Sequence, residues 1–273
     1  MNFNDQLNNA IKQNNSLVCV GLDPELSKLP EHIKKLENPQ FEFNKAIIDA
    51  TQDLVCVYKP NPAFYEARGD RGVKELKMTC EYIHATYPEI PVIIDAKRGD
   101  IGNTNEGYAQ YVFDYLDADA ITVMPYMGIE SLDAFFARKG KGIIVGCHSS
   151  NAGAKEFQEM LMEDGLALYE VVAEELIKQH GKNPNAMMFM GATYPEQLSE
   201  IRKIVGNMTF LVPGVGAQGG DIEAFLSAGL NAELAGLIIN SSRGIIFASN
   251  GKDFAERARE ETVKLKEEIN KYR

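Results

Sequence analysis

The feature that most constrains the fold is a succession of eight short apolar segments, each bounded by Gly, Pro, Asn or Asp. Continuous apolar runs of this length indicate strands that are buried on both faces, as the strands of parallel sheets are. Helical patterns lie between them, and this alternation predicts parallel pairing. We expect strands at 17–23, 54–60, 91–97, 120–125, 142–148, 186–192, 209–216 and 236–243, and helices at 41–53, 72–87, 103–116, 165–180, 194–205 and 221–228.

Eight comparable strands favour a closed (β/α)8 barrel, the TIM-barrel architecture of the α/β class, over an open doubly wound sheet, which would alternate in the same way. A charged helix expected at 253–271 also suits closure. Because about 250 residues is usual for one such barrel, and no linker rich in Pro, Gly or Ser interrupts the series, we expect one domain over residues 1–273. Phe3, Leu7 and Ile11 lie at helical spacing and predict a short helix that closes the bottom of the barrel.

Charge and cysteine content limit the partners and the compartment. A formal net charge of −11 disfavours nucleic acid and anionic membranes as partners, so a small molecule is expected. The N-terminal segment lacks the basic and apolar parts of a signal peptide, and no stretch reaches the length of a membrane span, which predicts a cytoplasmic protein. Four cysteines without metal-type spacing are expected to be reduced core thiols, with a free functional thiol as the alternative: Cys19, Cys56, Cys80 and Cys147.

Charged residues close four of the expected strands. The active sites of such barrels lie at the carboxyl ends of the strands, so these side chains face the place where chemistry occurs. Asp95 and Lys97 are two residues apart and therefore share a face, and Asp100 follows shortly after. One such pair would equally suit a salt-bridge network at the barrel mouth, but four charged endings together favour a site. They are Asp23, Lys59, Asp95 with Lys97, and Arg243.

A glycine-rich segment, 213–221, follows the seventh expected strand, and Ser241-Ser242-Arg243-Gly244 ends the eighth. Phosphate groups in barrels commonly bind between these two loops, where glycines let backbone amides approach the oxygens. Arginine adds a bidentate contact. Glycines alone would equally suit a tight turn, so the position in the barrel order is what favours a phosphate site.

The region after the fifth expected strand leaves two interpretations open. His148 ends that strand and either contacts a ligand or is a structural histidine with satisfied hydrogen bonds, which is the commoner case. The connection 149–185 is the longest in the chain and begins with a loop of small and polar residues. That loop is either a lid over the site or a surface excursion.

The sequence Asp95-Ala96-Lys97-Arg98-Gly99-Asp100 matches the Asp-x-Lys-x-x-Asp motif of the orotidine 5′-monophosphate decarboxylase suprafamily. The ends of the first and second strands, the glycine-rich segment and the end of the last strand also resemble this suprafamily, in the same order. The forms DAKRGDIGNT and KPNPAFYE are similar to its bacterial branch. The resemblance extends from about residue 18 to residue 244 and implies a barrel that acts as a decarboxylase.

Residue by residue, the resemblance implies a charged array of Lys59, Asp95 and Lys97, completed by Asp100 from the partner chain of a homodimer with shared active sites. It further implies a binding site for a nucleotide, orotidine 5′-monophosphate. The serine that contacts the base is Ser150, with Ser149 as the alternative. Gln218 matches a residue that bridges phosphate and base. The remaining implied contacts, to ribose or phosphate, are Asp23, Thr104 (also from the partner), Gly219, Arg243 and Gly244.

The implied reaction explains why charged residues are needed. Loss of CO2 from C6 of the pyrimidine leaves an electron pair in the plane of the ring, where the π system cannot delocalise it. A protonated lysine beside that carbon stabilises the carbanion and then delivers the proton, which assigns both roles to Lys97. Neither a metal nor an organic cofactor is expected.

Two other functions fit parts of the pattern. A Mg²⁺-dependent decarboxylase or aldolase acting on sugar phosphates shares the motif, but it has an acidic residue where this chain has Lys59, a cation that would repel the metal. A non-catalytic barrel that binds a phosphorylated ligand is the other candidate. Retention of all four charged strand ends disfavours it.

Overall fold

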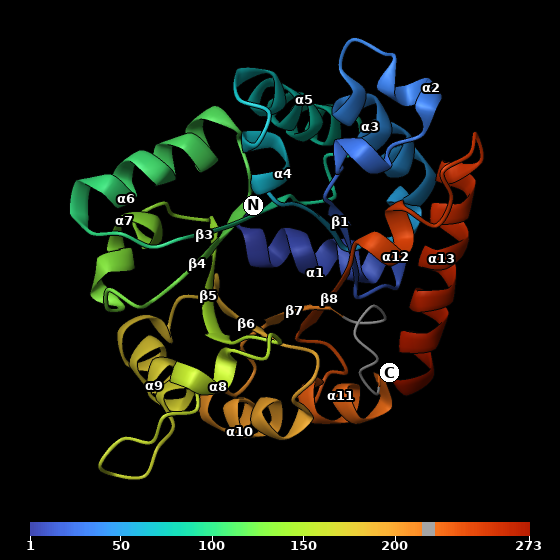
Figure 1. Ribbon diagram of the computed structural model, residues 1–273. Helices are drawn as coiled ribbons and strands as arrows, with labels where there is room; N and C mark the ends of the chain where they lie inside the picture. Colours follow the sequence, from blue (N-terminus) through green and yellow to red (C-terminus); the bar gives the residue numbers. More distant parts are fainter. Residues whose placement is uncertain (215–221) are drawn as a thin grey trace.

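The computed structural model describes residues 1–214 and 222–273 of the chain. Eight strands form one parallel sheet in the order β2-β1-β8-β7-β6-β5-β4-β3. Tyr58 of β2 donates its N–H to Pro91 O at 3.1 Å and bridges to Val92 before β3, so the two ends of the sheet meet. The predicted (β/α)8 barrel is therefore confirmed, and Figure 1 shows its helices arranged around the strands.

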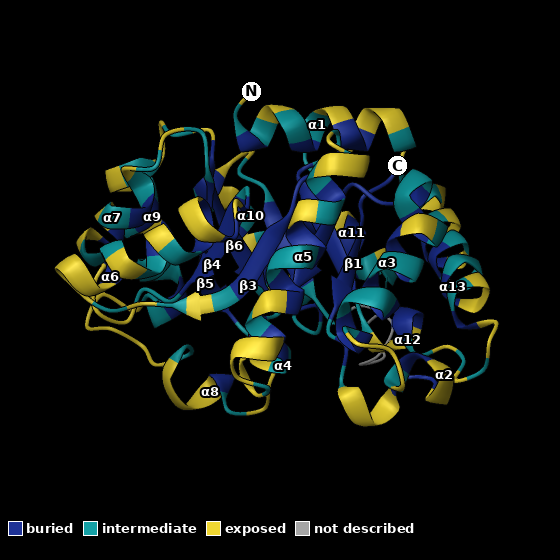
Figure 2. Ribbon diagram, turned by 90° about the horizontal axis from the view of Figure 1, so that it is seen from above, coloured by how far each residue is buried: buried dark blue, intermediate teal, exposed yellow. Residues whose placement is uncertain are grey.

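Each strand falls inside or beside its expected segment. The observed strands are β1 (Val18–Leu22), β2 (Val57–Pro60), β3 (Ile93–Arg98), β4 (Ala120–Val123), β5 (Gly142–His148), β6 (Ala186–Met190), β7 (Phe210–Pro213) and β8 (Leu237–Ser241). Their residues are buried with few exceptions, and Figure 2 shows the strands coloured as buried with helices outside them. Strands of such barrels are buried on both faces, by the helices outside and by the inward side chains.

The six expected internal helices are also present. They correspond to α3 (Pro39–Thr51), α5 (Asp70–Thr86), α6 (Gly102–Ala109), α9 (Leu168–His180), α10 (Pro195–Val205) and α11 (Ile222–Gly229). The helix expected at 103–116 is α6 followed by a π-helical segment over Gln110–Tyr115. Shorter helices are α2 (Glu31–Lys34), α4 (Ala63–Glu66), α7 (Asp133–Phe136), α8 (Ala154–Phe157) and α12 (Arg243–Ile246).

The N-terminal helix α1 (Phe3–Asn14) covers the end of the barrel where the strands begin. Phe3 and Leu7 are fully buried, and the Phe3 N–H donates to Gly140 O at 2.7 Å, just before β5. A Cβ on Gly142 would lie 2.3 Å from the Phe3 ring, so glycine at the start of β5 makes room for the helix. In Figure 2, α1 lies on the opposite side of the barrel from α4, α8 and α12. The predicted closure of the barrel bottom is confirmed.

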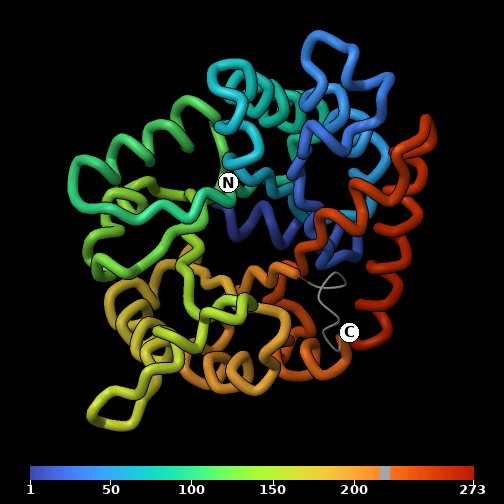
Figure 3. The backbone as a smooth tube through the Cα atoms, in the orientation of Figure 1, coloured from blue at the N-terminus to red at the C-terminus, as the bar shows by residue number. Residues whose placement is uncertain are grey.

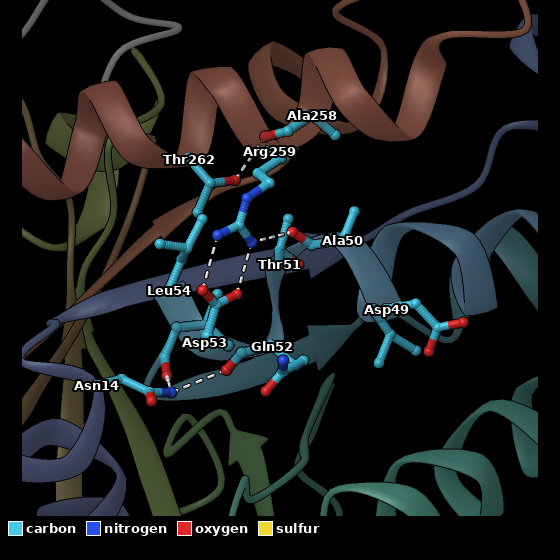
Figure 4. A network of polar contacts seen from close by, with 12 residues as sticks. Asn14, Asp49, Ala50, Thr51, Gln52, Asp53, Leu54, Ala258, Arg259 and Thr262 are labelled. Atoms are coloured by element: carbon cyan, nitrogen blue, oxygen red, sulfur yellow. Dashed lines mark hydrogen bonds and ion pairs between the residues drawn. The ribbon is translucent and has the colours of Figure 1, made fainter.

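The C-terminal helix α13 (Phe254–Ile269) fastens the end of the chain to α3, as Figure 4 shows. Arg259 donates to both carboxylate oxygens of Asp53, at 2.6 and 2.7 Å, and to Ala50 O at 2.7 Å. The bidentate geometry is the strong form of this contact, and the arginine hydrogen bond holds the pKa of Asp53 below its ordinary value. In the same region Asn14 of α1 donates to Gln52 O and Val55 O at 2.8 Å. The first and last helices thus fasten to the same turn.

All four cysteines are free and buried, in agreement with the prediction of reduced core thiols. Burial raises the pKa of Cys56 and of Cys80 to about 12 and raises the pKa of Cys19 and Cys147 as well. The four side chains are therefore neutral, inert core groups at physiological pH. Among the described residues, no helix combines the length and the apolar character needed to cross a membrane.

Candidate active site

A cavity of about 200 Å³ opens where the strands end, on the side of the barrel opposite α1. Its walls come from the ends of several different strands and from the loops that follow them. The lining residues are Asp23, Lys59, Asp95, Ser150, Pro213, Gly214, Asn240, Ser241, Ser242 and Arg243. A larger hollow of about 620 Å³ near Phe247 contains no buried charged side chain. Chemistry rather than size therefore locates the candidate site.

Two lysines share one buried carboxylate at this cavity: Lys59 and Asp95 line it, and Lys97 is bonded to Asp95 without being a lining residue itself. Lys59 of β2 donates to Asp95 Oδ2 at 2.7 Å, and Lys97 of β3 donates to Asp95 Oδ1 at 2.5 Å. Asp95 and Lys59 are 8% and 2% exposed, whereas 44% of the Lys97 side chain is accessible. The expected array of three charged residues is present as a connected group, and its accessible member is Lys97.

The charges in this array stabilise each other against burial. Burial favours neutral Asp95, but the attraction of Lys59 and Lys97 outweighs it and holds the pKa of Asp95 far below its ordinary value. Burial likewise disfavours charged Lys59, but Asp95 and then Asp23 outweigh it and raise the pKa of Lys59 above its ordinary value. Both members of the buried pair are thus ionised at neutral pH.

The backbone at the end of β3 departs from a regular strand. Pairing with β4 shifts register between Ile94 and Arg98, and Lys97 has a left-handed φ of 47°. The Lys97 N–H donates to Thr122 Oγ1 at 3.0 Å, and the Thr122 hydroxyl donates to Asp95 Oδ1 at 2.9 Å. Sequence reasoning did not identify Thr122. The only signal was a threonine within an otherwise apolar expected strand, which β propensity alone explains.

The opposite wall of the cavity is formed by β7, β8 and the start of α12. Gly214 follows β7 with φ 96°, a conformation that favours glycine. Ser242 donates to Gly21 O at 3.1 Å, and a Cβ on Gly21 would lie 2.6 Å from Ser242 Cβ, so β1 needs glycine at this contact. Arg243 and Gly244 begin α12 at the rim, and the Arg243 guanidinium has no ion pair with a described residue. Gln218 and Gly219 lie outside the described residues.

The two serine candidates for the base contact differ in their surroundings. Ser150 lines the cavity, whereas Ser149 donates its N–H to Gln158 Oε1 at 2.7 Å and its hydroxyl to Asn151. A Cβ on Gly191, after β6, would lie 2.5 Å from Ser150 N, so the serine backbone rests directly on that glycine. These contacts fix the start of the loop before it projects from the barrel between α8 and α9 (Figure 3).

His148 does not line this cavity. It is fully buried, its Nε2 lies 3.1 Å from Glu159 Oε1, and it packs edge-on against Tyr169 and Tyr194. Burial is the main cause that lowers the pKa of His148 below its ordinary value. The structural interpretation of this histidine is favoured, but its hydrogen bonds are satisfied only in part, because the buried Nδ1 has no partner among the described residues.

Asp100 and Thr104 lie outside the cavity. Asp100 Oδ1 accepts the N–H of Ile101 at 2.8 Å, and Asp100 forms no ion pair with a described residue. Thr104 is on α6 and lines a separate surface hollow. Asp23 lies beside the array and accepts the N–H of Asn61 at 3.2 Å. Of the predicted site residues that the structure describes, Asp23, Lys59, Asp95, Ser150 and Arg243 line the cavity. Lys97 is bonded to Asp95 and Gly244 follows Arg243, whereas Asp100 and Thr104 lie apart.

Within the part of the chain that the structure describes, no three His, Cys, Asp or Glu side chains are grouped as ligands of a metal ion would be. Asp23 and Asp95 are the acidic residues that line the cavity, and Lys59 lies close to both. A lysine ammonium in this position competes with any divalent cation for the carboxylates.

The fold and this cavity define a (β/α)8-barrel enzyme with a polar site at the carboxyl ends of its strands. Over residues 16–258 the chain matches the model of the Orotidine 5'-phosphate decarboxylase / HUMPS family, and it belongs to that family. An orotidine 5'-phosphate decarboxylase of Cellvibrio japonicus is 48% identical over 272 residues, covering 99% of this chain and 98% of the relative. An orotidine 5'-phosphate decarboxylase of Flavobacterium johnsoniae is 49% identical over 264 residues, covering 97% of this chain and 96% of the relative.

Solved structures give the same result. The chain superposes on the OMP decarboxylase of Leishmania donovani with a TM-score of 0.85 at 37% identity, covering 100% of this chain and 99% of the other. A putative orotidine-monophosphate-decarboxylase from Toxoplasma gondii gives a TM-score of 0.86 at 35% identity, covering 99% and 96%. These relatives are named as decarboxylases, and the chain is an enzyme of the carboxy-lyase class.

Proposed function

We propose that this enzyme decarboxylates orotidine 5′-monophosphate to uridine 5′-monophosphate, the last step of de novo pyrimidine biosynthesis, as a cytoplasmic homodimer. The observation that carries the proposal is the array of two lysines on one buried carboxylate, in a cavity whose opposite wall is built from β8 and Arg243. Such a site suits a substrate with a phosphate at one end and a developing carbanion at the other. The printed names of full-length relatives support the same substrate.

In the proposed reaction the C6–carboxylate bond breaks, CO2 leaves, and the electron pair stays on C6. The Lys97 ammonium stabilises this localised charge electrostatically and transfers a proton to C6, which yields uridine 5′-monophosphate and neutral lysine. Because 44% of the Lys97 side chain is accessible, water can return the proton. Asp95 orients the ammonium at 2.5 Å, and Lys59 neutralises the buried carboxylate from its other side. The step needs no electron acceptor and no metal.

The remote parts of the nucleotide hold the base against the array. We assign the phosphate to Arg243, Gly244, Gln218 and Gly219, the ribose to Asp23, and the base to Ser150. Phosphate contacts that persist through the reaction supply binding energy, which can be used to position C6 beside Lys97. Arg243, whose guanidinium forms no ion pair with a described residue, and Ser150 both line the cavity, which supports these roles.

Asp100 and Thr104 are proposed to act in the partner's site. Both lie outside the cavity of their own chain, close to apolar side chains that are unusually accessible: Ile101, Tyr126 and Met127 are 57%, 86% and 52% exposed. Asn105 of α6 donates to Asp100 O at 2.5 Å and to Ser131 O at 2.7 Å, which connects the segment after β3 to the 3-10 helix over Glu130–Leu132 that follows β4. An apolar face of this kind suits an isologous interface, across which each chain donates the same residues to the other.

Mixing two inactive variants tests the shared site. Lys97→Ala and Asp100→Ala subunits are combined and allowed to exchange. Under random assortment about half of the dimers are mixed, and each mixed dimer holds one intact site and one doubly defective site, so roughly a quarter of all sites recover. Verified exchange without recovered activity would show that Asp100 serves its own chain, and it would leave the decarboxylase assignment in place.

Loss of orotidylate absorbance, measured with and without a chelator, tests the function itself. Turnover that survives thorough chelation supports the proposed reaction. Strict dependence on added Mg²⁺, or turnover of a sugar phosphate alone, would move the chain to the metal-dependent part of its family. Tight nucleotide binding without turnover would favour a sensor.

A further inference from the structure

Thr122, on β4, contacts the charged array twice with one hydroxyl group. It is fully buried, its Oγ1 lies 2.9 Å from Asp95 Oδ1, and it accepts the Lys97 N–H at 3.0 Å. Since Asp95 is ionised, the hydroxyl proton must point to the carboxylate, which leaves an oxygen lone pair for the Lys97 amide. The two hydrogen bonds therefore fix each other's direction.

This double contact occurs where β3 leaves its regular pairing with β4. The register shifts between Ile94 and Arg98, and the ladder resumes with the Met124 N–H donating to Arg98 O at 2.8 Å. Between these points Lys97 has a φ of 47°, a region that a residue with a Cβ seldom adopts and that the surroundings must stabilise. Irregularities of this kind re-aim side chains near active sites.

Both oxygens of the Asp95 carboxylate accept hydrogen bonds, and each has its own partners. Oδ1 accepts from Thr122 and from Lys97 Nζ, and Oδ2 accepts from Lys59 Nζ. Rotation of the carboxylate would break all three contacts together. The Thr122 hydroxyl binds the same oxygen as Lys97, so it adds to the contacts that hold the Asp95 carboxylate in one rotation.

We infer that Thr122 is a positioning residue for the reaction: its hydroxyl holds the Lys97 backbone in the left-handed conformation and sets the rotation of Asp95, so that the Lys97 ammonium stays against the carboxylate that lines the cavity. Thr122 is fully buried and is not among the residues that line the cavity, so we expect it to act through Lys97 and Asp95 and not by direct contact with substrate. The inference rests on the proposed role of Lys97 as the group that meets C6.

Thr122→Val removes the hydroxyl while keeping the shape of the side chain. We expect kcat to fall by about 10- to 100-fold, which equals about 1.4 to 2.7 kcal/mol of transition-state stabilisation. KM should change by less than about threefold, because the phosphate, ribose and base contacts remain. Thr122→Ser restores the hydroxyl and should return kcat to within about threefold of wild type. Thr122→Ala also lacks the hydroxyl but puts no methyl group against the carboxylate, so it gives a second measurement should the valine variant not fold.

Thr262→Val is the matched control. Thr262 is also fully buried, and its hydroxyl donates to Ala258 O at 2.7 Å within α13, away from the cavity (Figure 4). The same chemical change there should leave kcat and KM unchanged. A kcat loss in Thr262→Val equal to that in Thr122→Val would show a general effect of losing a buried hydroxyl and would overturn the inference.

Crystal structures of wild type, Thr122→Val and Thr122→Ser complete the test. We expect Lys97 to leave the left-handed region in the valine variant and to keep it in the serine variant. Wild-type kcat in Thr122→Val, or an unchanged Lys97 backbone and Asp95 rotation in it, would refute the positioning role. If the wild-type enzyme does not consume orotidine 5′-monophosphate, the proposed function fails, whereas the three structures still decide whether Thr122 positions Lys97.

Discussion

Replacing Asp95 with Asn tests how the buried charges of the array are balanced. The amide keeps the shape of the carboxylate but leaves Lys59, which is 2% exposed, without its direct partner at 2.7 Å. Removing one member of a buried ion pair costs about 3–5 kcal/mol of unfolding free energy. Asp23 still acts on Lys59, so we expect the lower end of that range, about 3 kcal/mol at neutral pH. For a chain of this size the melting temperature should fall by about 6–12 °C.

The pH dependence of this loss has a defined sign. In wild type the pKa of Lys59 lies above its unfolded value, so its contribution to stability is fully present below about pH 10 and is lost only as pH rises further. In Asp95→Asn the main remaining influence on Lys59 is burial, which lowers its pKa below the unfolded value. The variant should therefore gain stability as pH rises towards about 10, and its deficit relative to wild type should shrink.

Urea unfolding, followed by far-UV circular dichroism because the chain contains no tryptophan, measures this deficit at neutral pH and at about pH 9. Protein concentration is held constant, since assembly contributes to apparent stability. Asp253→Asn is the control: it makes the same chemical change at an exposed ion pair with Arg257 and should leave stability unchanged. An Asp95→Asn protein as stable as wild type, or a deficit that grows as pH rises, would refute this account of the array.

Three further substitutions address individual contacts. Lys97→Ala should bind uridine 5′-monophosphate with the wild-type Kd in calorimetry while losing turnover, and near-normal turnover would contradict the proposed proton donor. Arg243→Ala should raise KM by about 10- to 150-fold, as expected from a charge-assisted contact of about 1.5–3 kcal/mol; unchanged KM and kcat would remove it from the phosphate site. Gly191→Ala places a Cβ 2.5 Å from Ser150 N and should raise KM through displacement of that serine, with circular dichroism to check folding. An unaltered KM in a folded Gly191→Ala protein would separate Ser150 from base binding.

The barrel could be predicted from the sequence because every strand is buried on both faces and reads as an uninterrupted apolar run. At two strand ends near the cavity, the expected and observed bounds differ where the chain departs from regular pairing. The segment expected at 17–23 pairs only over Val18–Leu22, since Asp23 turns towards the cavity. The segment expected at 91–97 is observed as Ile93–Arg98, with the register shift at its end.

The charged array could also be predicted, because four charged strand ends together favour a site and the resemblance to the suprafamily implies which of them meet. Lys59, Asp95 and Lys97 were expected to meet, and hydrogen bonds of 2.5 and 2.7 Å connect them. Thr122 could not be predicted in the same way. A threonine in a strand packs like valine, and only the register of β3 against β4 brings its hydroxyl to the Lys97 amide.

Asp100 illustrates the limit of reasoning from motif spacing. It belongs to the same hexapeptide as Asp95 and Lys97, yet its carboxylate caps the Ile101 N–H beside α6, whereas Asp95 is buried between two lysines. Two residues of chain past Arg98, where the register shift ends, are enough to carry it out of the barrel mouth and next to exposed Ile101. Motif spacing identifies residues that belong to one motif. It does not show whether each side chain points into the cavity of its own chain, because that depends on the direction in which the backbone leaves the strand. Under the proposed dimer, the irregular end of β3 therefore serves two sites: it aims Lys97 inward, and it carries Asp100 across the interface to the partner.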